Sequence, residues 1–276
     1  MTSAAKSLRS ALFVPATRPE RFEKALAAGA DAVIIDLEDA VERTAKTQAR
    51  DHVREFALTA APASFLLRVN DASTPWFEDD LALCADCDAI AGIMLPKTES
   101  AAQVNRVAAV GKPVVPIIES ARGVLALAEI AGAGGIERLS FGYLDLMLDT
   151  ATTPDTAGAR LLLDHIRCQI LLHSAANTLA APLDGVYPNF ADAQGLAQLA
   201  TQVRDMGFGG MLCIHPKQVG VIHTVFQPAE QEVSWARRVL EQAEATASSA
   251  FQLDGQMVDA PVIERARRIV AQVSEQ

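Results

Sequence analysis

The sequence predicts a (β/α)8 barrel of the TIM type, followed by a C-terminal helical extension. Short apolar runs rich in β-branched residues alternate along the chain with helical stretches whose apolar residues recur at 3.6-residue spacing. Eight such runs occur before residue 215, and most are continuously apolar, which is typical of parallel strands buried on both faces. Eight is also the number of strands that closes such a barrel. An open, doubly wound sheet is the alternative.

The predicted strands, in chain order, are residues 11–15, 32–36, 65–69, 92–95, 114–119, 138–142, 182–186 and 210–214. Residues typical of helix ends agree with this assignment. Pro19 stands near the start of a predicted helix over 18–28, and Gly29 follows its end, as expected for N-terminal proline and C-terminal glycine.

Beyond residue 216 the pattern becomes helix-rich. Amphipathic stretches cover residues 229–245 and 261–273, and between them Asp254-Gly255 lies within an apolar segment, which predicts a hairpin over 251–258. We therefore expect a barrel domain over residues 1–225 and a helical extension over 226–276. Such an extension has little core of its own, so its apolar face should pack against a barrel, its own or a neighbour's.

Composition and motifs argue against several classes of function. With 34 acidic and 24 basic residues the net charge is −10, and no Lys/Arg cluster indicates a nucleic-acid partner. No apolar stretch reaches the roughly 18 residues of a membrane span, and the first ten residues lack a signal-peptide core, which favours a cytoplasmic location. We interpret the four cysteines as structural thiols. The motifs typical of nucleotide hydrolysis, dinucleotide redox chemistry and serine hydrolysis are absent.

Polar residues follow the predicted strands at their carboxyl ends, where a parallel barrel has its active site. Glu119 and Asp145 come from neighbouring strands, whose axes are about 4.8 Å apart. Two carboxylates, completed by waters and a ligand oxygen, suit Mg²⁺. The alternative is that each acid only caps the helix behind its strand.

Arg68 lies inside an apolar run, where an unpaired cation would be costly. Either it forms a buried ion pair with Asp36 or Glu38, or it binds a substrate carboxylate or a developing enolate oxygen. We expect Arg68, Asp36 and Lys97 to contact substrate. Glu38 is expected to orient waters on the metal.

Ten segments carry a resemblance to a known family: residues 9–16, 18–21, 29–41, 68–70, 95–97, 118–120, 207–210, 214–218, 226–228 and 257–261. Together they resemble the citrate lyase beta subunit-like group of the HpcH/HpaI aldolase superfamily, over nearly the whole chain. Two positions depart from the usual pattern. Leu144 replaces an acid in the usual Gly-Ala-Glu-Asp segment, and Met211 replaces a lysine. Both alter charge near the mouth of the barrel and leave the acyl group open.

The resemblance implies a Mg²⁺-dependent enzyme that cleaves or forms a carbon–carbon bond in a 3-hydroxyacyl-CoA thioester, such as citryl-, malyl- or citramalyl-CoA. It implies that Glu119 and Asp145 bind the metal, that Arg68 holds substrate oxygen, and that Asp259 is a catalytic base delivered from a neighbouring subunit. Since this base comes from a neighbouring subunit, we expect a homo-oligomer, either a trimer or a hexamer. The alternatives are a thioesterase of the malyl-CoA type and a non-catalytic assembly subunit.

Overall fold

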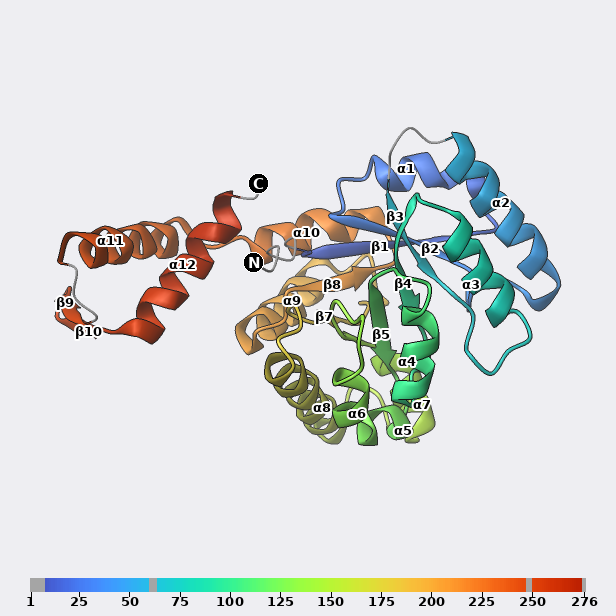
Figure 1. The fold of residues 1–276 in the computed structure, drawn as a ribbon. Coiled ribbons are helices and arrows are strands. Elements are labelled where there is room, and N and C mark those ends of the chain that lie inside the picture. Colours follow the sequence, from blue (N-terminus) through green and yellow to red (C-terminus); the bar gives the residue numbers. More distant parts are fainter. Residues whose placement is uncertain (1–7, 60–63, 247–249, 275–276) are drawn as a thin grey trace. The chain divides into compact units, whose positions relative to one another are not determined.

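The structure is a computed structural model that describes residues 8–59, 64–246 and 250–274. Its strands form a closed, parallel eight-stranded barrel (Figure 1). These strands are β1 (Ser10–Pro15), β2 (Ala32–Asp36), β3 (Phe65–Arg68), β4 (Ile90–Leu95), β5 (Val114–Ile118), β6 (Ser140–Phe141), β7 (Leu183–Asp184) and β8 (Gly210–Cys213). All eight predicted strands are therefore present. Because β1 pairs with β8 as well as with β2, the barrel closes and the open-sheet alternative is wrong.

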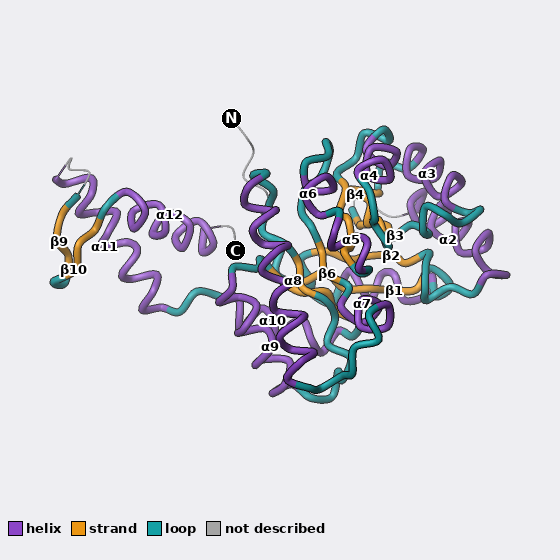
Figure 2. Tube along the Cα trace, turned by 90° about the horizontal axis from the view of Figure 1, so that it is seen from below, coloured by secondary structure: helices purple, strands orange, loops and turns teal. Residues whose placement is uncertain are grey.

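Helices surround the strands, as the purple and orange segments of Figure 2 show. They are η1 (Pro19–Arg21), α1 (Phe22–Leu26), η2 (Arg43–Ala45), α2 (Lys46–Thr59), α3 (Phe77–Asp86), α4 (Ala101–Ala108), α5 (Ala121–Leu125), α6 (Leu127–Ala131), α7 (Tyr143–Asp149), α8 (Ala157–Ala176), α9 (Ala193–Met206) and α10 (Pro216–Phe226). The single helix predicted over 18–28 is instead a 3₁₀ turn followed by a five-residue α-helix. Gly29 then adopts φ +77°, a conformation that favours glycine.

Side chains that point inward from the strands fill the barrel. The buried cluster consists of Ala11, Ile34, Leu66, Met94, Val115, Ile117, Leu183 and Leu212. Successive side chains of a strand point to opposite faces, so the residue two positions further along each strand points inward one layer higher. This spacing brings the polar residues at the strand ends to the mouth of the barrel.

The C-terminal residues form a second compact unit. The barrel unit covers Leu8–His223, and the other contains the described residues from Thr224 onward. It consists of α11 (Glu230–Thr246), the antiparallel hairpin of β9 (Phe251–Leu253) and β10 (Gln256–Val258), and α12 (Ala260–Ser274). These are the two helices and the hairpin that the sequence predicts.

This second unit has a small core of its own, formed by Ala236, Val239, Val258, Ile263 and Ala266. Side chains such as Trp235 and Phe251 pack around that core. The expectation of an extension with little core therefore underestimated the packing between its two helices and its hairpin. That it packs on a neighbouring subunit stays a prediction.

Two further findings concern the described part of the chain. It contains no helix of the length and apolarity that a membrane crossing requires. Its four cysteines are free thiols, three of them buried and Cys168 exposed.

Candidate functional site

The mouth of the barrel collects charged side chains because of strand register. Asp36 and Arg68 are direct partners across β2 and β3, and each lies two residues beyond a member of the buried cluster, Ile34 or Leu66. Both side chains therefore point into the barrel just above its apolar core. Asp36 is 1% exposed, so its charge needs a partner.

Arg68 supplies that partner. Its Nε and Nη2 each donate a hydrogen bond of 2.7 Å to the two carboxylate oxygens of Asp36, and its Nη1 lies 3.1 Å from Oε2 of Glu38. Burial opposes ionisation of Asp36, but the adjacent guanidinium outweighs it and holds the pKa of that carboxyl below its ordinary value. The ring of Phe13 lies 4.7 Å below the guanidinium carbon. The ion-pair alternative for Arg68 is therefore present in the structure.

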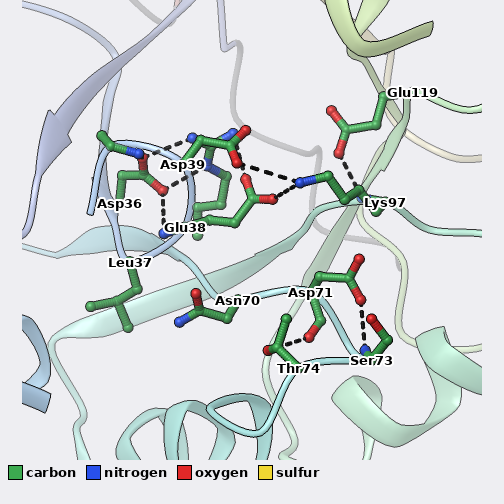
Figure 3. Close-up of polar contacts among 12 residues, drawn as sticks. Asp36, Leu37, Glu38, Asp39, Asn70, Asp71, Ser73, Thr74, Lys97 and Glu119 are labelled. Carbon is green, nitrogen blue, oxygen red and sulfur yellow. Dashed lines mark hydrogen bonds and ion pairs between the residues drawn. The ribbon is translucent and has the colours of Figure 1, made fainter. Parts of the chain in front are cut away.

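Lys97 connects the two sides of the mouth (Figure 3). It follows β4 and has a φ of +47°, which is rare for a residue other than glycine. Its backbone N–H donates a 2.6 Å hydrogen bond to Oε1 of Glu119, while its ammonium forms ion pairs with Glu38 and, at 3.4 Å, with Asp39. Burial lowers the pKa of Lys97, but the neighbouring carboxylates, Glu38 above all, outweigh it and raise that pKa, so the ammonium stays charged.

Glu119 is the first residue beyond β5, and it is 4% exposed. Its position is fixed from behind, because the Ser120 hydroxyl accepts a hydrogen bond from the Gly123 N–H and caps α5. Burial, reinforced by the negative charges of Glu38 and Asp145, raises the pKa of Glu119 to about 8. The neighbours of Glu119 therefore do not compensate its negative charge, and the ionised form is disfavoured until a cation binds beside it.

Asp145 lies in the first turn of α7, three residues after Gly142, which follows the end of β6. It lines two hollows together with Glu119. One, of about 370 Å³, is also lined by Lys97 and Asp71, and the other, of about 70 Å³, lies beside Arg68. The structure thus brings the two predicted metal ligands and Arg68 to one place.

The donor set fits a magnesium ion. Among the residues that the structure describes, no group of three or more His, Cys, Asp or Glu side chains could hold a metal. Mg²⁺ does not require one, since it is usually bound through one or two carboxylates and keeps several waters. A divalent cation beside Glu119 and Asp145 would supply the positive charge that ionisation of Glu119 requires.

Asp259 lies in the second unit, between β10 and α12. Its carboxylate accepts a 3.4 Å hydrogen bond from the N–H of Val262, so it caps the start of α12. The role of a base for another subunit's site stays a prediction.

Two polar residues at strand ends do not join this site. Asp184 is fully buried in an ion pair with Arg167 of α8, at 3.0 Å. His215 stacks on Phe190 with ring centroids 4.6 Å apart, and its Nδ1 accepts a hydrogen bond from the Lys217 N–H, so it holds a loop.

Sequence reasoning missed two contributors to the site. The backbone N–H of Lys97 binds Glu119, which depends on a φ value that no residue pattern indicates. Gly142 leaves room for the Glu119 side chain, because a Cβ at Gly142 would lie 2.6 Å from the Cβ of Glu119. A glycine at the last position of the predicted strand 138–142 was the available signal.

Comparisons with known proteins agree with one another. Residues 9–216 match the family model described as HpcH/HpaI aldolase/citrate lyase. The citrate lyase subunit beta-like protein of Mycobacterium tuberculosis is 39% identical over 96% of this chain and 95% of its own length. The (3S)-malyl-CoA thioesterase of Cereibacter sphaeroides is 36% identical over 98% and 96%. The crystal structure of CitE from M. tuberculosis with magnesium, acetoacetate and coenzyme A superposes with a TM-score of 0.84 at 36% identity, covering 98% of this chain and 99% of that one.

Proposed function

Because this chain belongs to the HpcH/HpaI aldolase/citrate lyase family, we propose that it is a Mg²⁺-dependent lyase that cleaves a carbon–carbon bond of a 3-hydroxyacyl-CoA thioester. The substrate would be of the citryl-, malyl- or citramalyl-CoA type. The observation that carries this proposal is that Glu119, Asp145 and Arg68 line one small hollow at the mouth of the barrel. Cleavage develops charge at two oxygens, that of the new carbonyl group and that of the enolate. The hollow offers the proposed metal site for the first and the Arg68 guanidinium for the second.

Glu119 and Asp145 would hold the metal, which supplies Lewis-acid polarisation of the substrate oxygen that becomes a carbonyl. The protein fixes Glu119 through the Lys97 N–H and the Ser120 cap, so the carboxylate is oriented before substrate arrives. Glu38, buried next to Lys97, would orient waters at the same place.

Arg68 would stabilise the thioester enolate that leaves when the bond breaks. Two of its five N–H groups are bound to Asp36, and its Nη1 lies 3.1 Å from Glu38. These contacts hold the guanidinium plane still and leave two N–H groups for the enolate oxygen. Asp36 therefore acts on substrate through Arg68. Lys97, whose side chain is 36% exposed, would contact substrate at the rim.

The reaction also needs a base that removes the proton of the 3-hydroxyl group. We assign this role to Asp259 of a neighbouring subunit, in a homo-oligomer that is a trimer or hexamer. Support comes from the family resemblance of the 257–261 segment. Mixing Asp259→Asn chains with Glu119→Gln chains should restore part of the activity, since some sites then combine an intact base with intact ligands. Confirmed mixed oligomers without recovery would refute the shared site.

A thioesterase is the second candidate, favoured by the similarity to the C. sphaeroides malyl-CoA thioesterase. The same enolate-stabilising site could direct water to the thioester carbonyl. A non-catalytic assembly subunit is a third, less favoured because the predicted ligands and Arg68 are gathered at one hollow.

Product analysis decides among the three. Purified protein is incubated with malyl-, citramalyl- and citryl-CoA, with Mg²⁺ and with EDTA. A lyase gives a shorter acyl-CoA and an oxoacid, whereas a thioesterase gives free CoA. Absence of turnover with all three, together with no Mg²⁺ binding at millimolar concentration, would leave the assembly subunit.

A further inference from the structure

The hollow beside the proposed metal site has two unlike walls. One wall consists of Arg68, Glu119 and Asp145. The rest is largely apolar and is formed by Phe13, Ile117, Phe141, Tyr143, Leu144, Val186 and Leu212. Its volume is about 70 Å³, and an apolar cavity of about 150 Å³ is large enough for benzene. It therefore accepts a group of a few heavy atoms.

The charges of this hollow are already matched. Arg68 is the one cation among the described residues that line it, and it is bound to Asp36 through two hydrogen bonds and faces Glu38 as well. The two carboxylates of the proposed metal site balance a divalent cation. The donors that Arg68 keeps are the ones proposed for the enolate oxygen, so a carboxylate pushed against the apolar wall would have no cation of its own. A buried carboxylate without a partner is strongly disfavoured.

The candidate thioesters differ in the substituent on the carbon that bears the hydroxyl group. That substituent is hydrogen in malyl-CoA, methyl in citramalyl-CoA and a carboxymethyl group in citryl-CoA. Each also carries one carboxylate on this carbon, which can reach the metal site. We infer that the protein prefers 3-hydroxyacyl-CoA substrates with a small alkyl substituent, above all methyl, at this carbon and disfavours a second carboxylate. The inference rests on the proposed function.

Leu144 is the residue of this wall that sets the preference. It lies in the first turn of α7 next to Asp145 and is 45% exposed, so its side chain stands at the rim, where a longer polar side chain could enter the hollow without disturbing the core. The neighbouring wall positions, such as Phe141 and Leu212, are buried and can accept no charge.

The test measures binding of oxoacids, the products of cleavage, and does not require turnover. Pyruvate, 2-oxobutyrate and freshly dissolved oxaloacetate are titrated by calorimetry in saturating Mg²⁺. We expect pyruvate and 2-oxobutyrate to agree within about fourfold, the effect of one methylene group. Oxaloacetate should bind more than about tenfold more weakly than pyruvate. Equal or tighter binding of oxaloacetate, or no binding of pyruvate, overturns the inference.

Two variants of Leu144 sharpen the result. Leu144→Lys supplies a cation and should raise the affinity for oxaloacetate relative to pyruvate by about tenfold, whereas Leu144→Met, of similar length without charge, should keep the ranking. The same change of ratio in both variants would refute the role of charge at this position. Thermal melting confirms that both variants fold. Failure of the proposed function is seen separately, as a lack of cleavage of any thioester.

Discussion

Substituting Gly142 by alanine should displace Glu119 and so disturb the proposed metal site. A Cβ at this position would lie 2.6 Å from the Cβ of Glu119 and 3.0 Å from Cγ2 of Ile117. Carbon atoms in contact are normally about 3.5 Å apart. The Glu119 Cβ must therefore retreat by about 0.9 Å, the difference between 3.5 and 2.6 Å. Because the Gly142 N–H binds the Ile118 carbonyl at 3.0 Å, the backbone on both sides resists that shift.

The expected cost follows from these contacts. Overpacking of this kind destabilises by about 1–3 kcal/mol, which for a chain of this size lowers the melting temperature by about 2–12 °C. Displacement of a metal ligand by this amount should weaken Mg²⁺ binding by about tenfold or more. Differential scanning calorimetry measures the first quantity, and titration calorimetry with Mg²⁺ measures the second.

Gly134→Ala is the matched control, because a Cβ at Gly134 meets no atom within 4 Å. It should leave both quantities unchanged. If Gly142→Ala melted like the control, the packing argument would be refuted. If it melted lower but bound Mg²⁺ like the parent, Glu119 would not be a ligand.

Three further outcomes are expected. Glu119→Gln and Asp145→Asn should each abolish Mg²⁺-dependent turnover and the heat of Mg²⁺ titration while circular dichroism stays that of the parent, and retained metal dependence in either variant would exclude that residue as a ligand. Burial raises the pKa of Glu119 to about 8, so half of these groups are ionised at pH 8 and about one in a hundred at pH 6. The apparent affinity for Mg²⁺ should therefore fall about 50-fold between pH 8 and pH 6, and an affinity that is constant over this range in calorimetric titrations would contradict the assignment. Asp36→Asn removes one partner of a buried ion pair and should lower the free energy of unfolding by about 3 kcal/mol, the low end for such changes because Arg68 keeps Glu38; a urea denaturation midpoint equal to the parent's would show that the pair contributes little.

The barrel could be predicted from sequence because its strands are buried on both faces, which leaves continuous apolar runs in the chain. The lengths of the strands were harder to predict from the sequence. The predicted runs 138–142 and 182–186 contain strands of only two residues, Ser140–Phe141 and Leu183–Asp184, because apolar burial continues where strand pairing stops.

The candidate site could be predicted in its residue types but not in its contacts. Arg68 inside an apolar run indicated an anionic partner, yet the choice of Asp36 depends on the register between β2 and β3. A glycine at the end of a predicted strand signals a close approach, but that its partner is Glu119 of the neighbouring strand cannot be read along the chain. Spacing along a sequence identifies strand ends, whereas contacts across a barrel depend on how the strands are aligned.

At Lys97 the side chain that the site uses lowers the stability of the fold. A lysine with a φ of +47° is less stable there than glycine would be, by about 1–2 kcal/mol. Glycine could keep the N–H that binds Glu119, but it has no ammonium group to bind Glu38. Variants selected for heat resistance alone should therefore accumulate Lys97→Gly, and selection that also requires turnover should restore the lysine. At position 97 the backbone conformation favours glycine, whereas the ion pair with Glu38 requires lysine.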